Sequence, residues 1–144
     1  MPCPVARTLD VVGEWWTLMI VRDAFRGARR FEEFRSVGIA DNILSNRLRK
    51  LVQQGVFERR KYSDHPERFE YVLTEKGRDL LSVVAALASW GKKWTVGPDI
   101  TGMRHEVCGE PLRLQIYCDK CERTVDASEI RVPRAIRSEL SAAS

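Results

Sequence analysis

The feature of the sequence that most restricts its fold is a change of hydrophobic period at Gly55. Residues 42–54 follow a helical period, and their apolar side chains are Ile43, Leu44, Leu48, Leu51 and Val52. Asp41 precedes them as an expected N-cap, and Gly55 follows as an expected C′ residue. Strands are expected at 56–62 and 68–73, with a turn at 63–67. The sequence therefore predicts an amphipathic helix that leads directly into a β-hairpin.

Helical patterns surround this pair of elements. Before it, helices are expected at 4–12, 15–25 and 31–36, and Gly13 and Gly27 separate them. After it, Thr74 is expected to cap a fifth helix that runs to about Trp94. A short helix, a turn, a second helix and a hairpin follow one another in the order of a winged helix-turn-helix. The predicted fold class is mainly α with a small β-hairpin wing (α+β), plus a small Cys/His ribbon-like unit.

Three segments are expected along the chain of 144 residues. They are a winged-helix and dimerisation domain at 1–97, a zinc-ribbon-like appendage at 98–126 and a flexible tail at 127–144. The start of the chain has no apolar signal-peptide region, and the longest uncharged apolar run, Leu80–Gly91, is too short to span a membrane. We therefore expect a cytoplasmic protein with no membrane partner, in which cysteines stay reduced.

The predicted 42–54 helix has the composition required of a helix that enters the DNA major groove. Its polar side chains with expected DNA contacts are Asn42, Ser45, Asn46, Arg47, Arg49 and Lys50. Asn42, Ser45, Asn46 and Arg49 are expected at base edges, because Asn pairs with adenine and Arg with guanine. Arg47 and Lys50 are expected to meet phosphates or neighbouring helices. Residues 42–61 hold six Lys or Arg against one acid, Glu58.

The hairpin is the second expected contact with DNA. Its candidate residues are Arg59, Arg60, Lys61, His65 and Arg68. A basic wing along the sugar-phosphate backbone adds affinity that does not depend on sequence. The alternative is that these charges only solvate an exposed hairpin. The helix directly before them favours DNA, and the formal net charge of +4 is compatible with it.

Several runs, in the same order, resemble the HxlR family of winged-helix regulators. They are CPVARTLD (3–10), GEWWT (13–17), RFEEF (30–34), NILSNRL (42–48) and YVLTEKG (71–77). The resemblance covers residues 3 to about 122, with one departure at Trp15, where the family usually has a basic residue. It implies a dimeric DNA-binding repressor or activator. Of the two we expect a repressor, which binds a palindromic operator sequence-specifically. The resemblance also implies that the first and fifth helices pair between subunits.

The segment from Leu80 to Trp90 is apolar on nearly every side. Such a helix must be covered all round, so one face is expected on the core and another against a second copy of the chain. The alternative cover is the C-terminal unit of the same chain. Aromatic residues such as Trp16, Phe34 and Trp94 are expected mainly in the core, although they are also candidates for the lining of a small-effector pocket.

Two pairs of metal-binding residue types lie near the C-terminus. His105 and Cys108 form one pair, and Cys118 and Cys121 the other, each with two intervening residues. This is the layout of a Cys3His zinc ribbon, in which one closed structural Zn²⁺ joins two turns. The alternative is a metal-free ribbon with reduced thiols.

Cys3 stands apart from the other cysteines. It precedes Pro4 at a predicted helix start, where unpaired N–H groups favour a thiolate, and Arg7 lies one turn further on. The resemblance supports a sensor at this place, because redox- and aldehyde-sensing members use the matching cysteine. We therefore expect Cys3 and Arg7 to form a redox or electrophile sensor, while the alternative is a cysteine with no signalling role.

An enzyme is not expected. Only His65 and His105 are available as histidine bases, and no phosphate-binding glycine loop is present. A nucleobase deaminase needs H-x-E and P-C-x-x-C, whereas this sequence has His105-Glu106 and Tyr117-Cys118. The remaining alternatives are a small metalloenzyme and a winged-helix and ribbon module that binds another protein instead of an operator.

Overall fold

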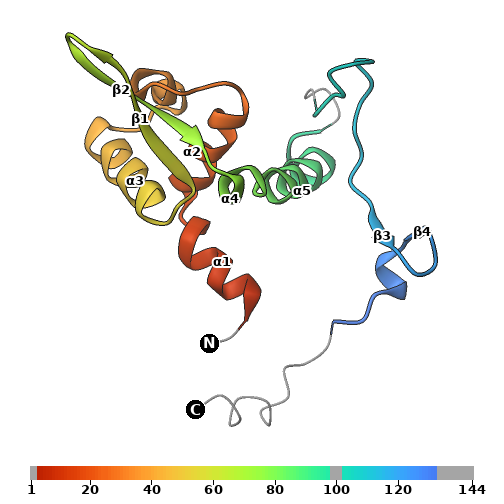
Figure 1. Ribbon diagram of the computed structural model, residues 1–144. Helices are drawn as coiled ribbons and strands as arrows, with labels where there is room; N and C mark the ends of the chain where they lie inside the picture. The colour runs from red at the N-terminus through yellow and green to blue at the C-terminus, as the bar shows by residue number, and fades with distance from the viewer. Residues whose placement is uncertain (1–2, 98–101, 133–144) are drawn as a thin grey trace, which may run out of the picture. The chain divides into compact units, whose positions relative to one another are not determined.

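The computed structural model describes residues 3–97 and 102–132 (Figure 1). The chain divides into two compact units, Met1–Met103 and Arg104–Ser144. The elements of the first unit are α1 (Pro4–Val12), α2 (Trp15–Phe25), the 3-10 helix η1 (Phe31–Val37), α3 (Asp41–Gln53), β1 (Phe57–Asp64), β2 (Glu67–Leu73), α4 (Glu75–Arg78), α5 (Leu81–Gly91) and the π-helix η2 (Lys92–Val96). The order of helices and hairpin predicted from the sequence is therefore confirmed.

The start of α3 differs from the prediction in one respect. Asp41 is the first helical residue and Ala40 is the N-cap, so the expectation that Asp41 caps the helix is wrong. The Asp41 carboxylate instead accepts two hydrogen bonds from Arg35, at 2.8 Å from Nε and 2.7 Å from Nη2. The end of α3 is as predicted, because Gly55 has φ +72° and directly follows the C-cap Gln54.

The core of the first unit holds α3 in place. Leu44, Leu48 and Leu51 lie on one side of α3 and are buried. They belong to one cluster with Ile20, Val21, Phe34, Ile39, Val56 and Phe57. The rings of Phe34, Phe57 and Tyr71 meet edge to face, with centroids 6.0 to 6.5 Å apart. Because the leucines fill the core, the opposite side of α3 faces outward.

The hairpin is longer and its turn shorter than predicted. Most of the expected turn at 63–67 belongs to the strands, since Ser63 pairs with Arg68 and Asp64 with Glu67. The turn is reduced to His65 and Pro66, which a cis peptide joins. The register shifts between Lys61 and Ser63, and the ring of the intervening Tyr62 lies under the guanidinium of Arg30 at 4.8 Å.

The fifth helix predicted to start after Thr74 is not continuous. Thr74 caps it as expected, with its hydroxyl accepting from the N–H of Gly77 at 3.1 Å. However, α4 ends at Arg78, a turn follows, and α5 begins only at Leu81. Gly77 lies so close to the hairpin that an added Cβ would be 2.2 Å from the carbonyl oxygen of Val56. This close approach ties α4 to the hairpin, and α5 follows α4 after the turn (Figure 1).

The second unit is small. It contains β3 (Ile116–Cys118), β4 (Arg123–Val125) and the 3-10 helix η3 (Ala127–Glu129). β3 and β4 form an antiparallel hairpin, and the Arg123 guanidinium pairs with the Glu129 carboxylate. The start of the predicted flexible tail therefore has structure as far as η3, while its part beyond residue 132 lies outside the described residues. Within residues 3–97 and 102–132, no helix has both the length and the apolarity to cross a membrane.

The contact at Gly77 generates a prediction about stability. In Gly77→Ala, the new methyl group meets the Val56 carbonyl and the Leu73 side chain. The Val56 carbonyl belongs to the backbone, so this clash is relieved only if the hairpin moves. We expect the free energy of unfolding to fall by about 2 kcal/mol in urea titrations. Gly102→Ala is the matched control, because its Cβ meets only the tip of Lys92 at 3.6 Å. Equal losses in the two variants would contradict the close approach.

Candidate DNA-binding surface

The outward side of α3 carries the polar residues predicted to reach DNA bases. Asn42, Ser45 and Arg49 are exposed and Asn46 is half-buried, on the side away from the leucine stripe. Lys50 is also exposed. Within the described part of the chain, no hydrogen bond or ion pair engages the side chains of Arg49 or Lys50. Two cations on this face are therefore available to an external partner.

Arg47 has a different environment from its neighbours on α3. Its side chain is only 25% exposed, and its Nε lies 3.2 Å from Oε2 of Glu14. The Nε–H direction does not make a hydrogen bond, so this contact is an ion pair by distance alone. Of the two roles expected for Arg47, the structure shows the contact with a neighbouring helix. Arg47 links α3 to the start of α2, where Glu14 is the N-cap.

The hairpin is less basic than its arginines suggest. Between Phe57 and Leu73, four Asp or Glu residues match four Lys or Arg residues. Arg60 donates to Glu58 at 3.1 Å, and Lys61 lies 2.9 Å from Glu67. The bond from Arg60 lowers the pKa of Glu58, so this carboxylate stays ionised. Much of the positive charge at 59–61 is therefore neutralised within the hairpin.

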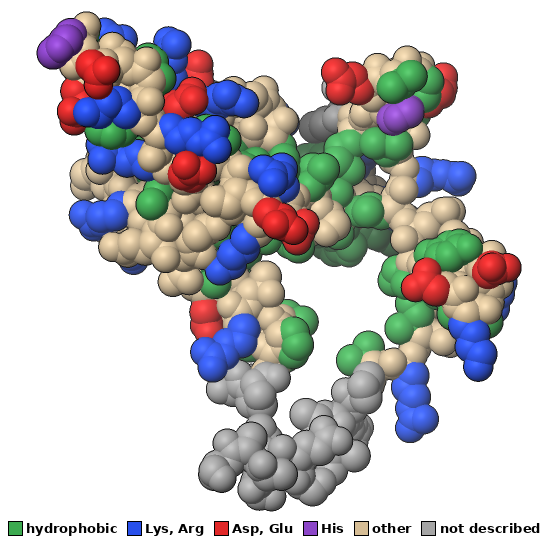
Figure 2. All heavy atoms as spheres, viewed as in Figure 1, with side chains coloured by type: hydrophobic (Ala, Val, Ile, Leu, Met, Phe, Trp, Pro, Cys, Tyr) green, Lys and Arg blue, Asp and Glu red, His purple; other side chains and the backbone are tan. Residues whose placement is uncertain are grey.

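Three other candidate residues of the hairpin are exposed. The guanidinium of Arg59 stacks on the ring of Phe69 at 3.6 Å, which fixes its direction without neutralising its charge. His65 and Arg68 are exposed at the turn end of the hairpin, which projects beyond α3 (Figure 1). In Figure 2, Lys and Arg side chains surround α3 and the hairpin, with acidic side chains between them.

Glu33 and Glu14, which sequence reasoning missed, hold the helices that support α3. The Glu33 carboxylate accepts the N–H groups of Arg29 and Arg30 at 2.7 and 2.9 Å, and these bonds, Arg30 first, lower its pKa. Glu14 accepts the N–H of Thr17 at 3.2 Å. The signal for Glu33 was its place at the third position of a short helix, as in a capping box.

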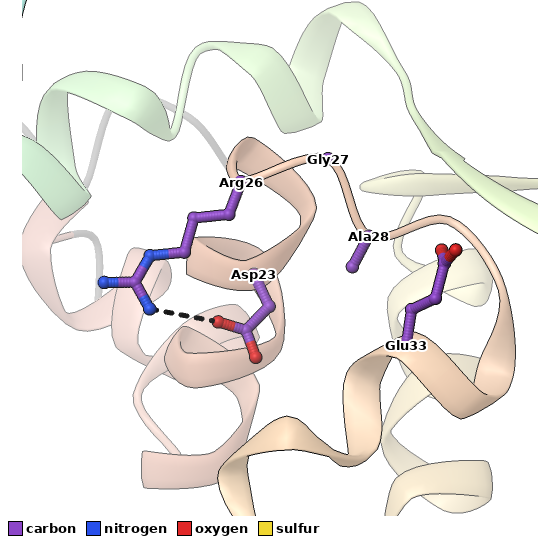
Figure 3. A pocket seen from close by; sticks show the side chains of 5 residues that line it. All are labelled: Asp23, Arg26, Gly27, Ala28 and Glu33. Carbon is purple, nitrogen blue, oxygen red and sulfur yellow. Dashed lines mark ion pairs between the residues drawn. The ribbon is translucent and has the colours of Figure 1, made fainter.

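A pocket of about 310 Å³ lies beside these supporting elements (Figure 3). It is lined by Asp23, Arg26, Gly27, Ala28 and Glu33. The Asp23 carboxylate pairs with Arg22 at 2.7 Å and with Arg26 at 3.7 Å, so its lining is already charge-paired. None of the aromatic residues considered for an effector pocket lines it. Phe34 is instead buried in the core, Trp16 packs against the core, and Trp94 is exposed.

Comparison with known proteins places this arrangement of α3 and the hairpin in a family of helix-turn-helix proteins. A sequence model described as HxlR-like helix-turn-helix matches residues 11–98. The chain belongs to this family. An HTH-type transcriptional regulator of Mycobacterium tuberculosis, Rv3095, is 45% identical over 130 residues, which cover 88% of this chain and 82% of that protein. YdeP of Bacillus subtilis, also named an HTH-type transcriptional regulator, is 38% identical over 94 residues, or 64% of this chain and 73% of YdeP.

Solved structures similar to this HxlR-like protein fall into two groups by coverage. PA1607, described as a transcription factor, has a TM-score of 0.80 and 42% identity over 92% of this chain and 95% of that chain. The redox regulator HypR in its reduced form has a TM-score of 0.59 and 36% identity, over 63% of this chain and 92% of HypR. The likeness to PA1607 therefore extends over more of the chain than the likeness to HypR.

Cys3 lies where the sequence placed it in this HxlR-like protein. It is the N-cap of α1 and half-buried, its thiol is free, and its side chain makes no capping hydrogen bond. The N–H of Arg7 donates to the carbonyl of Cys3 at 3.0 Å, while the Arg7 side chain is exposed. The structure therefore joins the two residues through their backbone.

The four predicted metal ligands form two close pairs. His105 Nδ1 lies 3.2 Å from Cys108 Sγ. Cys118 ends β3, and Cys121 lies within the turn that leads to β4. Bonds from the N–H and thiol of Cys121, then from the N–H of Lys120, lower the pKa of Cys118. Among residues 3–97 and 102–132, no three His, Cys, Asp or Glu side chains gather as a metal site. The structure thus brings each pair together but does not join the pairs.

Proposed function

We propose that this HxlR-like protein is a homodimeric transcriptional repressor that binds a palindromic duplex operator through α3. The observation that carries the proposal is the division of α3 into two sides. Leu44, Leu48 and Leu51 are buried, while Asn42, Ser45 and Arg49 face outward. A helix with one side in the core and polar donors and acceptors on the other fits the major groove, about 12 Å wide. The family assignment supports this use of α3.

Specificity and affinity are assigned to different parts of this surface. Arg49 and the amides of Asn42 and Asn46 read base edges, together with the Ser45 hydroxyl. Lys50, Arg59, Arg68 and His65 contact phosphates, which fix the register of the protein on DNA. Arg60 and Lys61 contribute less, because Glu58 and Glu67 already neutralise them. Arg47 acts through its contact with Glu14, which sets the position of α3.

The dimer rests on apolar side chains that the chain alone leaves uncovered. Leu87 and Trp90, three residues apart on α5, are 53% and 63% exposed. Val5 and Leu9, one turn apart on α1, are 67% and 57% exposed. Figure 2 shows the apolar side chains gathered over α5. A second copy that covers these residues removes them from water and sets the spacing of two α3 helices, about one DNA turn apart.

Regulation is proposed to act through Cys3 in a reducing cytoplasm. The Cys3 thiol reduces hydrogen peroxide to water and becomes a sulfenic acid, which condenses with a second thiol to form a disulfide and a further water. Because Cys3 begins α1, a bond at this residue changes the position of a helix assigned to the dimer interface. Structures of HypR, a redox regulator, in reduced and oxidised forms support this role by analogy.

The DNA-binding proposal is tested with Arg49→Ala. Loss of a bidentate contact to guanine costs about 1–3 kcal/mol, so operator affinity should fall by at least about fivefold while non-specific affinity falls less. Arg113→Ala is the matched control, because it removes the same charge from an exposed residue outside the winged-helix unit. Fluorescence anisotropy with operator and scrambled duplexes measures both affinities. Equal operator affinity in wild type and Arg49→Ala would contradict the role of α3.

The dimer proposal is tested with Trp90→Glu. A carboxylate buried in an apolar interface is costly, so this variant should be monomeric in size-exclusion chromatography with light scattering. Its circular dichroism should match that of wild type, because Trp90 is exposed within the chain. Val107→Glu, which changes an exposed apolar residue of the second unit, should remain dimeric. A dimeric Trp90→Glu, or a monomeric wild type, would rule out this interface.

The sensor proposal is tested with Cys3→Ser. Peroxide should weaken the operator binding of wild type, and a reductant should restore it, whereas Cys3→Ser should bind equally in both conditions. Thr8→Ser, a conservative change on α1 that leaves every thiol in place, serves as the control and should respond as wild type does. If peroxide still weakens binding by Cys3→Ser as much as by wild type, Cys3 is not the sensor.

A further inference from the structure

The second unit lacks what usually stabilises a unit of its size. Among its described residues, 104–132, no side chain is buried. Many of its larger apolar residues are exposed, from Val107 at 87% to Ile130 at 37%. Units of about 40 residues or fewer usually need a disulfide, a metal ion or a partner, because their hydrophobic core is too small. The unit nevertheless keeps two well-defined turns, and each turn carries one pair of metal-binding residue types.

The first turn is closed by hydrogen bonds around His105 and Cys108. The N–H of Gly109 donates to the carbonyl of His105 at 2.8 Å, and the N–H of His105 donates to the carbonyl of Glu110 at 2.9 Å. The His105 Nδ1 to Cys108 Sγ distance is 3.2 Å. Two ligands of a tetrahedral zinc ion lie about 3.5 Å apart, given Zn–S and Zn–N bonds of about 2.3 and 2.0 Å. The pair therefore already has nearly the separation of one edge of a zinc site.

The second turn has the same backbone feature at the equivalent position. Gly109 follows Cys108 with φ +73°, and Glu122 follows Cys121 with φ +51°. Among the described residues, Glu122 alone is a non-glycine residue with positive φ. A left-handed conformation is costly for such a residue and often marks a functional site.

We propose that the unit Arg104–Ser144 binds one structural Zn²⁺ through His105, Cys108, Cys118 and Cys121. The structure shows two half-sites that are separately formed, since no three candidate ligands gather within the described residues. Residues 112–115, between the two turns, belong to no helix or strand. The proposal requires this segment to bend so that the two half-sites meet. The ion thus supplies the cross-link that the missing core does not, so metal binding and folding of this unit are coupled.

A competing state of the same residues is a disulfide between Cys118 and Cys121. That bond forms when both thiols lose their protons and give two electrons to an oxidant such as peroxide. It would leave His105 and Cys108 without a role, and it would not explain why both turns share the left-handed residue after the second ligand. The two states are distinguishable, because zinc adds one ion per chain while a disulfide removes two hydrogens.

The experiment uses the full-length chain purified with zinc and reductant. We expect one zinc per chain by elemental analysis, and a tetrahedral thiolate spectrum when Co²⁺ replaces zinc. Cys118→Ser should lose most of the metal, whereas Cys3→Ser, the matched cysteine control outside the unit, should keep it. A chelator should accelerate hydrogen exchange in 104–130 and leave α3 unchanged. These readouts are independent of DNA binding.

Two results would overturn the proposal. One is a reduced chain that retains less than about one tenth of a zinc ion after loading, since structural sites of this kind bind tightly. The other is equal metal content in wild type and in Cys118→Ser. Mass spectrometry of the unreduced chain then shows whether the pair exists as a disulfide instead. Thermal unfolding of the winged-helix unit confirms that Cys118→Ser is folded when its metal is counted.

Discussion

The burial of Leu44, Leu48 and Leu51 is the interaction on which the rest of the structure depends. These leucines fix the rotation of α3, because each is at most 1% exposed within the core cluster. Truncation of one such leucine to alanine typically costs about 2–5 kcal/mol. The rotation in turn decides that Asn42, Ser45 and Arg49 face outward. The function proposed for α3 therefore follows from how tightly its other side is packed.

The positive charges of α3 and of the hairpin differ in how far nearby acids neutralise them. The residues of α3 leave Arg49 and Lys50 uncompensated, while the hairpin pairs Arg60 with Glu58 and Lys61 with Glu67. Exposed ion pairs such as these contribute little to stability, but they reduce the field that the hairpin presents to DNA. Under this account, sequence-dependent affinity is concentrated in α3, and the hairpin contributes mainly through Arg59, Arg68 and His65.

Local signals in the sequence were sufficient to predict most of the helices and the hairpin. Gly55 marked the end of α3 because a left-handed residue is a local requirement, and the leucine period marked its buried side. The prediction that Asp41 caps α3 was wrong. Its carboxylate accepts from Arg35, six residues earlier, and the sequence of α3 alone does not show this contact. The break between α4 and α5 was not predicted, and the close approach of Gly77 to the Val56 carbonyl exists only in the folded chain.

In the candidate sites too, some features could be predicted from local spacing and others depend on tertiary structure. The spacing of His105 with Cys108 and of Cys118 with Cys121 predicted each close pair, but whether the pairs join depends on long-range folding of residues 104–132. Arg47 was predicted either at phosphates or at a neighbouring helix, and its contact with Glu14 arises from tertiary structure. Spacing thus predicts which residues are neighbours on a turn or helix, and packing decides what they face.

The most direct test of the central claim is selection of duplex fragments from the protein's own genome, in reductant and at two salt concentrations. The account predicts that a few palindromic sites are enriched and that affinity for them falls steeply as salt rises, because phosphate contacts release counterions. If no fragment is enriched at either salt concentration, or if binding is insensitive to salt, then α3 is not an operator-reading helix in this protein and the surface serves another partner.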